Sequence, residues 1–249
     1  GNVLTFYQVP DLLIPDNNAT PFKAGMLATK KARAHAVCEN NGTLSSVTID
    51  FPGENYLSAP KVHIDLPTSG TDSSSDFRIA TIEASIDSSN KVTSLLVTDP
   101  GIGYANEPKV KIEGGVHFLR LSEKDSKHIG RFYKITENTS TTVTLNNPLQ
   151  HDLQTIFQDN QVVEIFEAWT LGSLLGYKVN ELSIKEGNSS TADYVYLLNQ
   201  ENQNGTSDDF SAYFHDGTNW RTLDSNASES DRIIHPDQAF IFARRNPTP

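Results

Sequence analysis

The sequence predicts an all-β protein, with two tandem three-stranded β repeats followed by a β-sandwich-like domain. Short segments of alternating apolar and polar residues recur along the 249 residues, separated by Gly, Pro, Asn and Asp. Two stretches of 21 residues also match each other in register, which indicates an internal repeat. Helix-like patterns are confined to two short stretches, around residues 22–30 and 151–157.

The composition excludes several classes of partner. With 20 Lys and Arg against 31 Asp and Glu, the formal net charge is −11, so we expect no nucleic-acid partner and no adsorption to anionic lipid. No apolar run approaches the ~20 residues that a membrane-spanning helix requires, so we expect no transmembrane segment. Cys38 is the single cysteine, which rules out an intrachain disulfide.

The repeat relates Leu44–Ile64 (LSSVTIDFPGENYLSAPKVHI) to Val92–Ile112 (VTSLLVTDPGIGYANEPKVKI) at an offset of 48 residues without a gap. It extends backwards, where alternate apolar positions of Ala32–Cys38 align with those of Ala80–Ile86. Each copy therefore predicts three strands, and we expect residues 32–64 and 80–112 to form the same unit.

A tight turn follows the second strand of each copy, because Pro restricts φ and Gly accepts a left-handed conformation. The Tyr after each turn is interpreted as a residue that packs over the turn; the alternative is a ligand-stacking ring. The predicted turn residues are Pro52, Gly53, Tyr56 and Pro60 in the first copy, and Pro100, Gly101, Gly103, Tyr104 and Pro108 in the second.

The repeat pattern P-G-x-G-Y-x-x-x-P-x-V-x-I resembles short β modules of exported bacterial surface proteins and phage tail-associated proteins. The second copy matches at Gly101, Gly103 and Tyr104, whereas the first copy has Glu54 and Asn55 where the pattern has a small residue and Gly. The resemblance implies a β module and names no ligand.

Alternation continues beyond the repeat, and Asp216-Gly217 is a hairpin signal. We therefore divide the chain into an N-terminal strand and linker (1–30), the repeat region (31–115) and a C-terminal β domain (116–249). Strands are expected near residues 117–121, 130–136, 141–145, 161–166, 194–198, 211–214, 219–223 and 239–243.

Three stretches of this domain, GRFYKITENT (130–139), AWTLG (168–172) and HPDQAF (235–240), resemble an uncharacterised family of exported, β-rich bacterial proteins. The resemblance covers roughly residues 117–245. It implies an extracellular or cell-surface location and no particular activity.

No catalytic or metal-binding motif is present. The seven His residues show neither H-x-x-x-H nor H-E-x-x-H spacing, and no G-x-S-x-G occurs. The acidic pairs Asp72/Asp76 and Asp208-Asp209 are interpreted as solvated loop charges rather than calcium or glycosidase carboxylates. We therefore expect a protein that is not an enzyme, with no cofactor and no metal site. Trp169 and Trp220 are expected to anchor a core or an interface rather than a sugar.

The N-terminal segment predicts a strand with apolar side chains on both faces, which Pro10 ends. Such a strand either pairs inside its own domain or adds to the sheet edge of a neighbouring subunit, and repetition of the second contact would produce a filament. The candidate assembly residues are Val3, Leu4, Thr5, Phe6, Tyr7 and Val9.

These features favour a non-enzymatic extracellular structural subunit, a homo-oligomer or polymer that assembles into a fibre or surface layer. The alternative is a carbohydrate-binding or adhesive surface module that acts as a monomer with a glycan as its partner.

Overall fold

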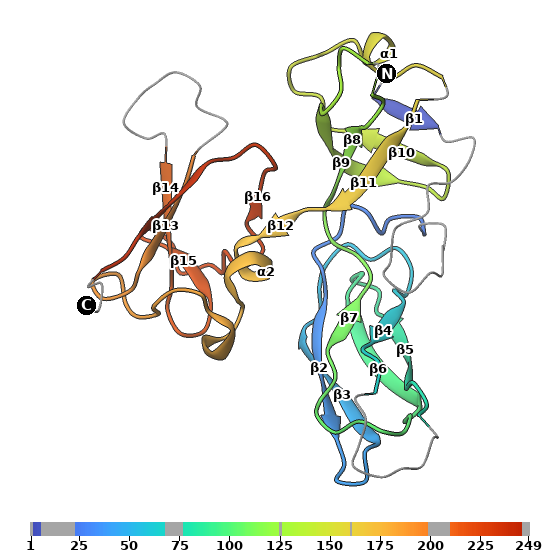
Figure 1. Ribbon diagram of the computed structural model, residues 1–249, viewed down its shortest axis with the longest axis vertical. Coiled ribbons are helices and arrows are strands. Elements are labelled where there is room, and N and C mark those ends of the chain that lie inside the picture. The colour runs from blue at the N-terminus through green and yellow to red at the C-terminus, as the bar shows by residue number, and fades with distance from the viewer. Residues whose placement is uncertain are drawn as a thin grey trace. The chain divides into compact units, whose positions relative to one another are not determined.

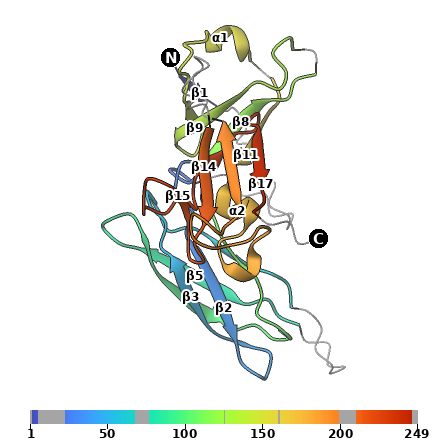
Figure 2. The ribbon, with the colours of Figure 1, turned by 90° about the vertical axis from the view of Figure 1, so that its left-hand side faces the viewer.

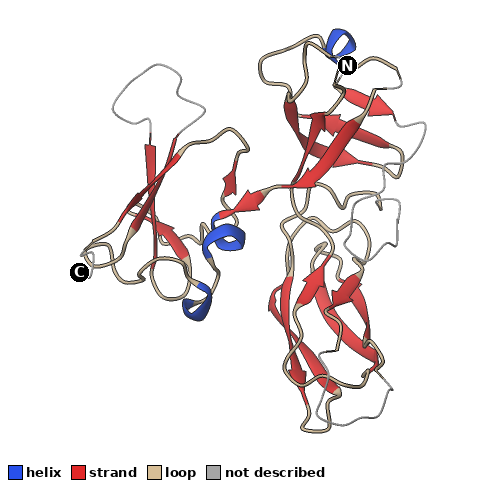
Figure 3. Cartoon of the chain, viewed as in Figure 1, coloured by secondary structure: helices blue, strands red, loops and turns tan. Residues whose placement is uncertain are grey.

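The computed structural model describes residues 2–5, 23–67, 77–124, 126–159, 161–198 and 210–245. The protein is all-β, as predicted, and its described residues form several antiparallel sheets and two short α-helices (Figure 1; Figure 3). It divides into two compact units, Gly1–Glu167 and Ala168–Pro249. The domain boundary that we placed at residues 115/116 therefore lies inside the first unit.

The two repeats form a pair of equivalent hairpins. In the first, β2 (Arg33–Cys38) pairs with β3 (Leu44–Phe51), and in the second, β5 (Thr81–Ile86) pairs with β6 (Val92–Asp99). The register shifts at equivalent places, between 33/34 and 37/38 in one copy and between 81/82 and 85/86 in the other. The strands of the two copies are therefore 48 residues apart, and so are their register shifts.

The third strand of each copy pairs with the other copy. The strand β4 (Val62–Ile64) lies antiparallel to β7 (Val110–Ile112), with His63 opposite Lys111 at the centre. Those two residues are equivalent in the repeat, so the pairing is symmetric about its centre. Each copy has the three strands that we expected, but they are not joined into one three-stranded sheet, because the third is exchanged.

Reciprocal backbone hydrogen bonds also join the copies. The Leu44 N–H donates to the Pro100 carbonyl at 2.9 Å, and the equivalent Val92 N–H donates to the Pro52 carbonyl at 2.9 Å. Each copy thus gives the other the bond that it receives, which is the arrangement of an isologous dimer. The repeats form an intertwined pair with internal two-fold pseudosymmetry.

The remainder of the first unit contains a five-stranded sheet in the order β1-β10-β9-β8-β11. Its core includes Leu119, Ile135 and Val143, and the helix α1 (Leu153–Ile156) adds Leu153 and Ile156. The strands are β1 (Val3–Thr5), β8 (His117–Leu121), β9 (Phe132–Asn138), β10 (Thr142–Leu145) and β11 (Val163–Glu167).

The prediction of a helix around residues 22–30 is wrong for the described part of that segment. Residues 24–27 form turns, and Ala28 and Lys30 make isolated β-bridges with Val116 and Glu54. Gly25 has a φ of 77°, which interrupts a right-handed helix. The bridge to Glu54 connects the segment to the first repeat, and the His117 N–H of β8 donates to the Leu27 carbonyl, so the segment joins the repeats to the five-stranded sheet.

The second unit contains a four-stranded sheet in the order β15-β14-β13-β17 and a small two-stranded sheet, β12-β16. Val195, Leu197, Tyr213 and Trp220 are buried on one face of the larger sheet. The elements are β12 (Trp169–Thr170), α2 (Leu171–Leu175), the 3₁₀ turn η1 (Val179–Glu181), β13 (Tyr194–Leu198), β14 (Phe210–His215), β15 (Trp220–Thr222), β16 (Ile233–Ile234) and β17 (Phe240–Ala243).

Among the described residues, the helices are all too short or too polar for a membrane-spanning segment.

The turn glycines of the repeats provide a stability test. Gly53 and Gly101 have φ values of 70° and 65°, and a Cβ on either would lie 2.6 Å from a carbonyl oxygen, that of Lys30 or Arg78. Gly130 also has a positive φ, 83°, but a Cβ there would meet no atom within 4 Å.

We expect Gly130→Ala to lower the free energy of unfolding by about 1 kcal/mol, the cost of the left-handed conformation. Gly53→Ala and Gly101→Ala should each cost a further ~1–3 kcal/mol, because the new methyl group overlaps the backbone. Urea unfolding would measure all three. Equal losses of unfolding free energy in all three variants would contradict the close packing of the repeat turns.

Candidate functional site

The two repeat tyrosines hold the turns and present no face to a ligand. Tyr56 and Tyr104 are buried, and their hydroxyls accept the N–H of Ala32 at 2.8 Å and of Ala80 at 2.9 Å. Burial raises the pKa of both phenols above the ordinary value. The structure therefore places these side chains as packing residues of the corner.

The other turn positions are also structural. Asn55, where the repeat pattern departs from Gly, has a φ of 67°, and the equivalent Gly103 has a φ of 96°. Asn tolerates this region better than most side chains, so the first copy keeps the turn. Pro60 is buried, Pro52 and Pro108 are half-buried, and Pro100 is exposed.

The N-terminal strand pairs inside its own chain. Val3, Leu4 and Thr5 lie opposite Thr144, Val143 and Thr142 of β10, and Leu4 packs against the core of the five-stranded sheet. This is the intramolecular alternative that we considered for the segment. Phe6, Tyr7 and Val9 lie outside the described residues, as do Asp72, Asp76, Asp208 and Asp209.

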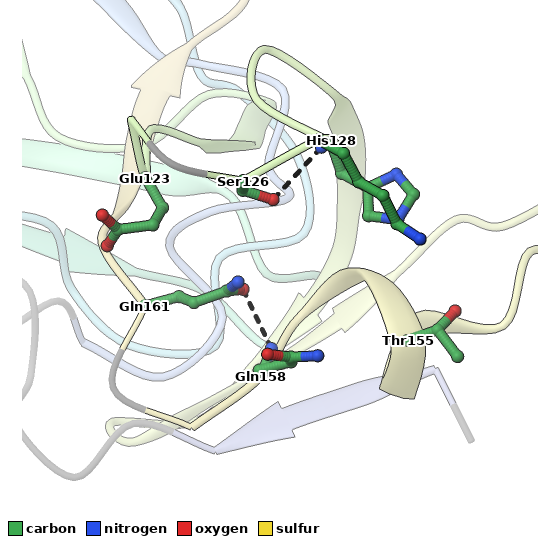
Figure 4. Close-up of a pocket in the computed structure, with 7 residues that line it drawn as sticks. Glu123, Ser126, His128, Thr155, Gln158 and Gln161 are labelled. Atoms are coloured by element: carbon green, nitrogen blue, oxygen red, sulfur yellow. Dashed lines mark hydrogen bonds between the residues drawn. The ribbon is translucent and has the colours of Figure 1, made fainter.

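One polar pocket lies at the surface of the first unit, between the loop after β8 and the segment around α1 (Figure 4). It has a volume of about 390 Å³. Desolvation, followed by the charges of Arg131 and Lys127, lowers the pKa of His128 below its ordinary value. The lining residues are Glu123, Ser126, Lys127, His128, Thr155, Gln158 and Gln161.

Part of this lining is engaged in hydrogen bonds within the protein. The Ser126 hydroxyl accepts the His128 N–H at 3.1 Å, and the Gln161 side chain accepts the Gln158 N–H at 2.9 Å. The remaining amide, hydroxyl and charged groups can hydrogen-bond a small polar molecule. In the described residues, no three His, Cys, Asp or Glu side chains gather where they could hold a metal ion.

The two tryptophans differ in exposure. Trp220 is buried in the core of the second unit, and its indole N–H donates to the Gly176 carbonyl at 2.9 Å. Trp169, on β12, is exposed. Trp220 therefore anchors a core, which is one of the two roles we expected.

The sheet edges are the places where another strand could add. Among the described strands, three of the four edges of the two larger sheets are charged or very short, and a charged edge discourages strand addition. The edge strand β11 carries Glu164 and Glu167, which bind Arg120 and Lys31. The edge strands β15 and β1 have only three residues each, and Arg221 of β15 binds Asp216.

The fourth edge, β17, is apolar and exposed. Its residues Phe240, Ile241 and Phe242 are 39%, 53% and 45% exposed, and the strand carries no charge. The two Phe rings contact each other edge to face, with centroids 5.2 Å apart. Figure 2 shows β17 as a red arrow at one side of its sheet, and β13 is its single partner among the described strands.

Two residues of β17 have backbone groups that point away from β13, its partner among the described strands. The Leu198 N–H donates to the Ala239 carbonyl, so residues 198 and 239 form a hydrogen-bonded pair of the β13–β17 ladder. Such pairs alternate with non-hydrogen-bonded pairs in an antiparallel ladder. The N–H and C=O groups of Phe240 and Phe242 therefore point away from β13, toward the open edge.

The exposed side chains and the outward backbone groups make β17 the candidate site of association. We predicted a strand at 239–243 but placed the assembly residues at the N-terminus. The signal was the same in both segments, apolar side chains on both faces of a short strand, and it occurs at Phe240, Ile241 and Phe242.

Comparison of the chain with family models, with curated proteins and with solved structures gives no match. The geometry of the edges is therefore the basis for a functional assignment.

Proposed function

We propose that the protein is a structural subunit that self-associates through its sheet edges into a fibre or surface layer, outside the cell or at its surface. The observation that carries the proposal is the exposed, uncharged edge strand β17. The extracellular location rests on the motifs at 130–139, 168–172 and 235–240, which resemble those of exported β-rich proteins.

An open apolar edge favours association for two physical reasons. A strand that adds to the edge receives main-chain hydrogen bonds from groups that otherwise bind water, and it covers apolar side chains on both faces. Soluble monomers usually block such edges with charge or cover them. This protein places charges at β11 and β15 but leaves β17 without one.

A polymer requires a second contact in each copy. The edge strand β1 is a candidate: it is short, but it carries no charge, Val3 is exposed, and the Asn2 carbonyl accepts the Leu145 N–H. By the same alternation, the backbone groups of Val3 and Thr5 point away from β10. Contacts at both β17 and β1 would continue beyond a dimer.

The second candidate function is a glycan-binding or adhesive module that acts as a monomer. The polar pocket of Figure 4 favours it, because its amide and hydroxyl groups suit a sugar. Saccharide binding that Gln158→Ala abolishes, in a protein that stays monomeric, would select this function.

Electron microscopy and sedimentation of the purified protein test the proposal directly. We expect filaments or sheets, preceded by a concentration-dependent series of oligomers, because edge-to-edge contacts obey mass action. A protein that remains monomeric at every attainable concentration, with no ordered particles, would contradict the proposed function.

A charge placed on the open edge should prevent association. We expect Ile241→Lys to raise the dissociation constant by at least about 100-fold, since an edge lysine must be desolvated when a strand adds. Leu223→Lys is the matched control, because Leu223 is an exposed apolar residue outside the strands of the same unit. Similar effects of both variants on sedimentation would show that β17 is not the contact.

A further inference from the structure

We infer that β17 pairs with β17 of a second copy, antiparallel, about a two-fold axis that passes between the two Ile241 residues. This inference rests on the proposed function, since it names the partner and the register of one of its contacts. It follows from the order of residues around the strand and from the direction of the backbone groups.

The segment Ala239–Ala243, with the sequence AFIFA, reads the same in both directions. When Ile241 faces Ile241 of the second copy, Phe240 faces Phe242, and Ala239 faces Ala243. Every residue of this segment thus meets an apolar residue of the second copy.

The backbone permits this register. The N–H and C=O groups of Phe240 and Phe242 are those that point to the open edge, so hydrogen-bonded pairs between copies must involve these two residues. In the inferred register, Phe240 of each copy pairs with Phe242 of the other, and both pairs are hydrogen-bonded. The Ile241 pair between them is then non-hydrogen-bonded, with Cα atoms about 4.5 Å apart.

The two neighbouring registers that satisfy the backbone are less complementary. Pairing Phe240 with Phe240 places Phe242 opposite Gln238, whose side chain is already bound to the His235 N–H and the Leu198 carbonyl. Pairing Phe242 with Phe242 places Phe240 opposite Arg244. Both alternatives set an aromatic ring against a polar side chain.

Both faces of the enlarged sheet gain apolar contacts. Phe242 and Phe240 are opposite Val195 and Leu197 in the ladder, so four Phe rings would gather on the face that bears those residues. Ile241 is opposite Tyr196, so the two Ile241 side chains would meet on the other face. The four-stranded sheet would become a continuous eight-stranded sheet.

Engineered cysteines test the register. In a Cys38→Ser background, which removes the single native thiol, Ile241→Cys should form a disulfide-linked dimer under mild oxidation, because Cα atoms 4.5 Å apart are within disulfide range. Phe240→Cys and Phe242→Cys should each crosslink at least ~10-fold more slowly alone, but readily when the two variants are mixed. Leu223→Cys is the control for random collision.

The other outcomes overturn the inference. Faster crosslinking of Phe240→Cys alone or of Phe242→Cys alone would indicate one of the other registers, and rates no higher than that of Leu223→Cys would exclude the contact. Microscopy of the unmodified protein separates the two proposals. Filaments without crosslinking at Ile241 would support the proposed function and exclude this contact. Crosslinked dimers that never polymerise would support this contact and contradict the proposed function.

Discussion

The requirement that backbone N–H and C=O groups find partners organises this protein, because its strands are short and each sheet ends in an edge. The repeats meet the requirement by exchange, since β4 and β7 pair with each other and the Leu44 and Val92 N–H groups bond across the copies. At β11, charged side chains oppose the addition of a further strand. The edge of β17 has neither device, so we propose that a strand of another molecule pairs with it.

The repeat pair shows that this chain already uses the inferred type of contact. The strands β4 and β7 are equivalent, and they meet antiparallel about the His63–Lys111 pair. Two β17 strands would meet in the same manner about Ile241. The internal pair is held by chain connectivity as well as by contacts, whereas the pair between copies must also overcome the loss of translational freedom. Burial of the aromatic and aliphatic side chains that are exposed on β17 would offset this additional free-energy cost.

Local patterns predicted the strands and turns of this fold well, and failed where pairing is non-local. The 48-residue offset located all six repeat strands, but periodicity indicates faces and not partners, so the exchange of β4 and β7 was missed. The helix α2 was missed because its capping box uses Thr170 with Ser173 rather than Glu or Gln. For the site, the apolar pattern predicted the N-terminal strand. The same pattern occurs at Phe240–Phe242, but the sequence does not show that β17 lies at the edge of its sheet, so the candidate site there was not predicted.

Residue-resolved amide hydrogen exchange of β17 tests the central claim most directly. In dilute, monomeric protein, the amides of Phe240 and Phe242 should exchange rapidly, whereas those of Ile241 and Ala243 are protected by β13. At concentrations where the protein associates, the amides of Phe240 and Phe242 should become protected to the same degree as their neighbours. Rapid exchange of these two amides in the associated protein would contradict the account, because the open edge would then remain open.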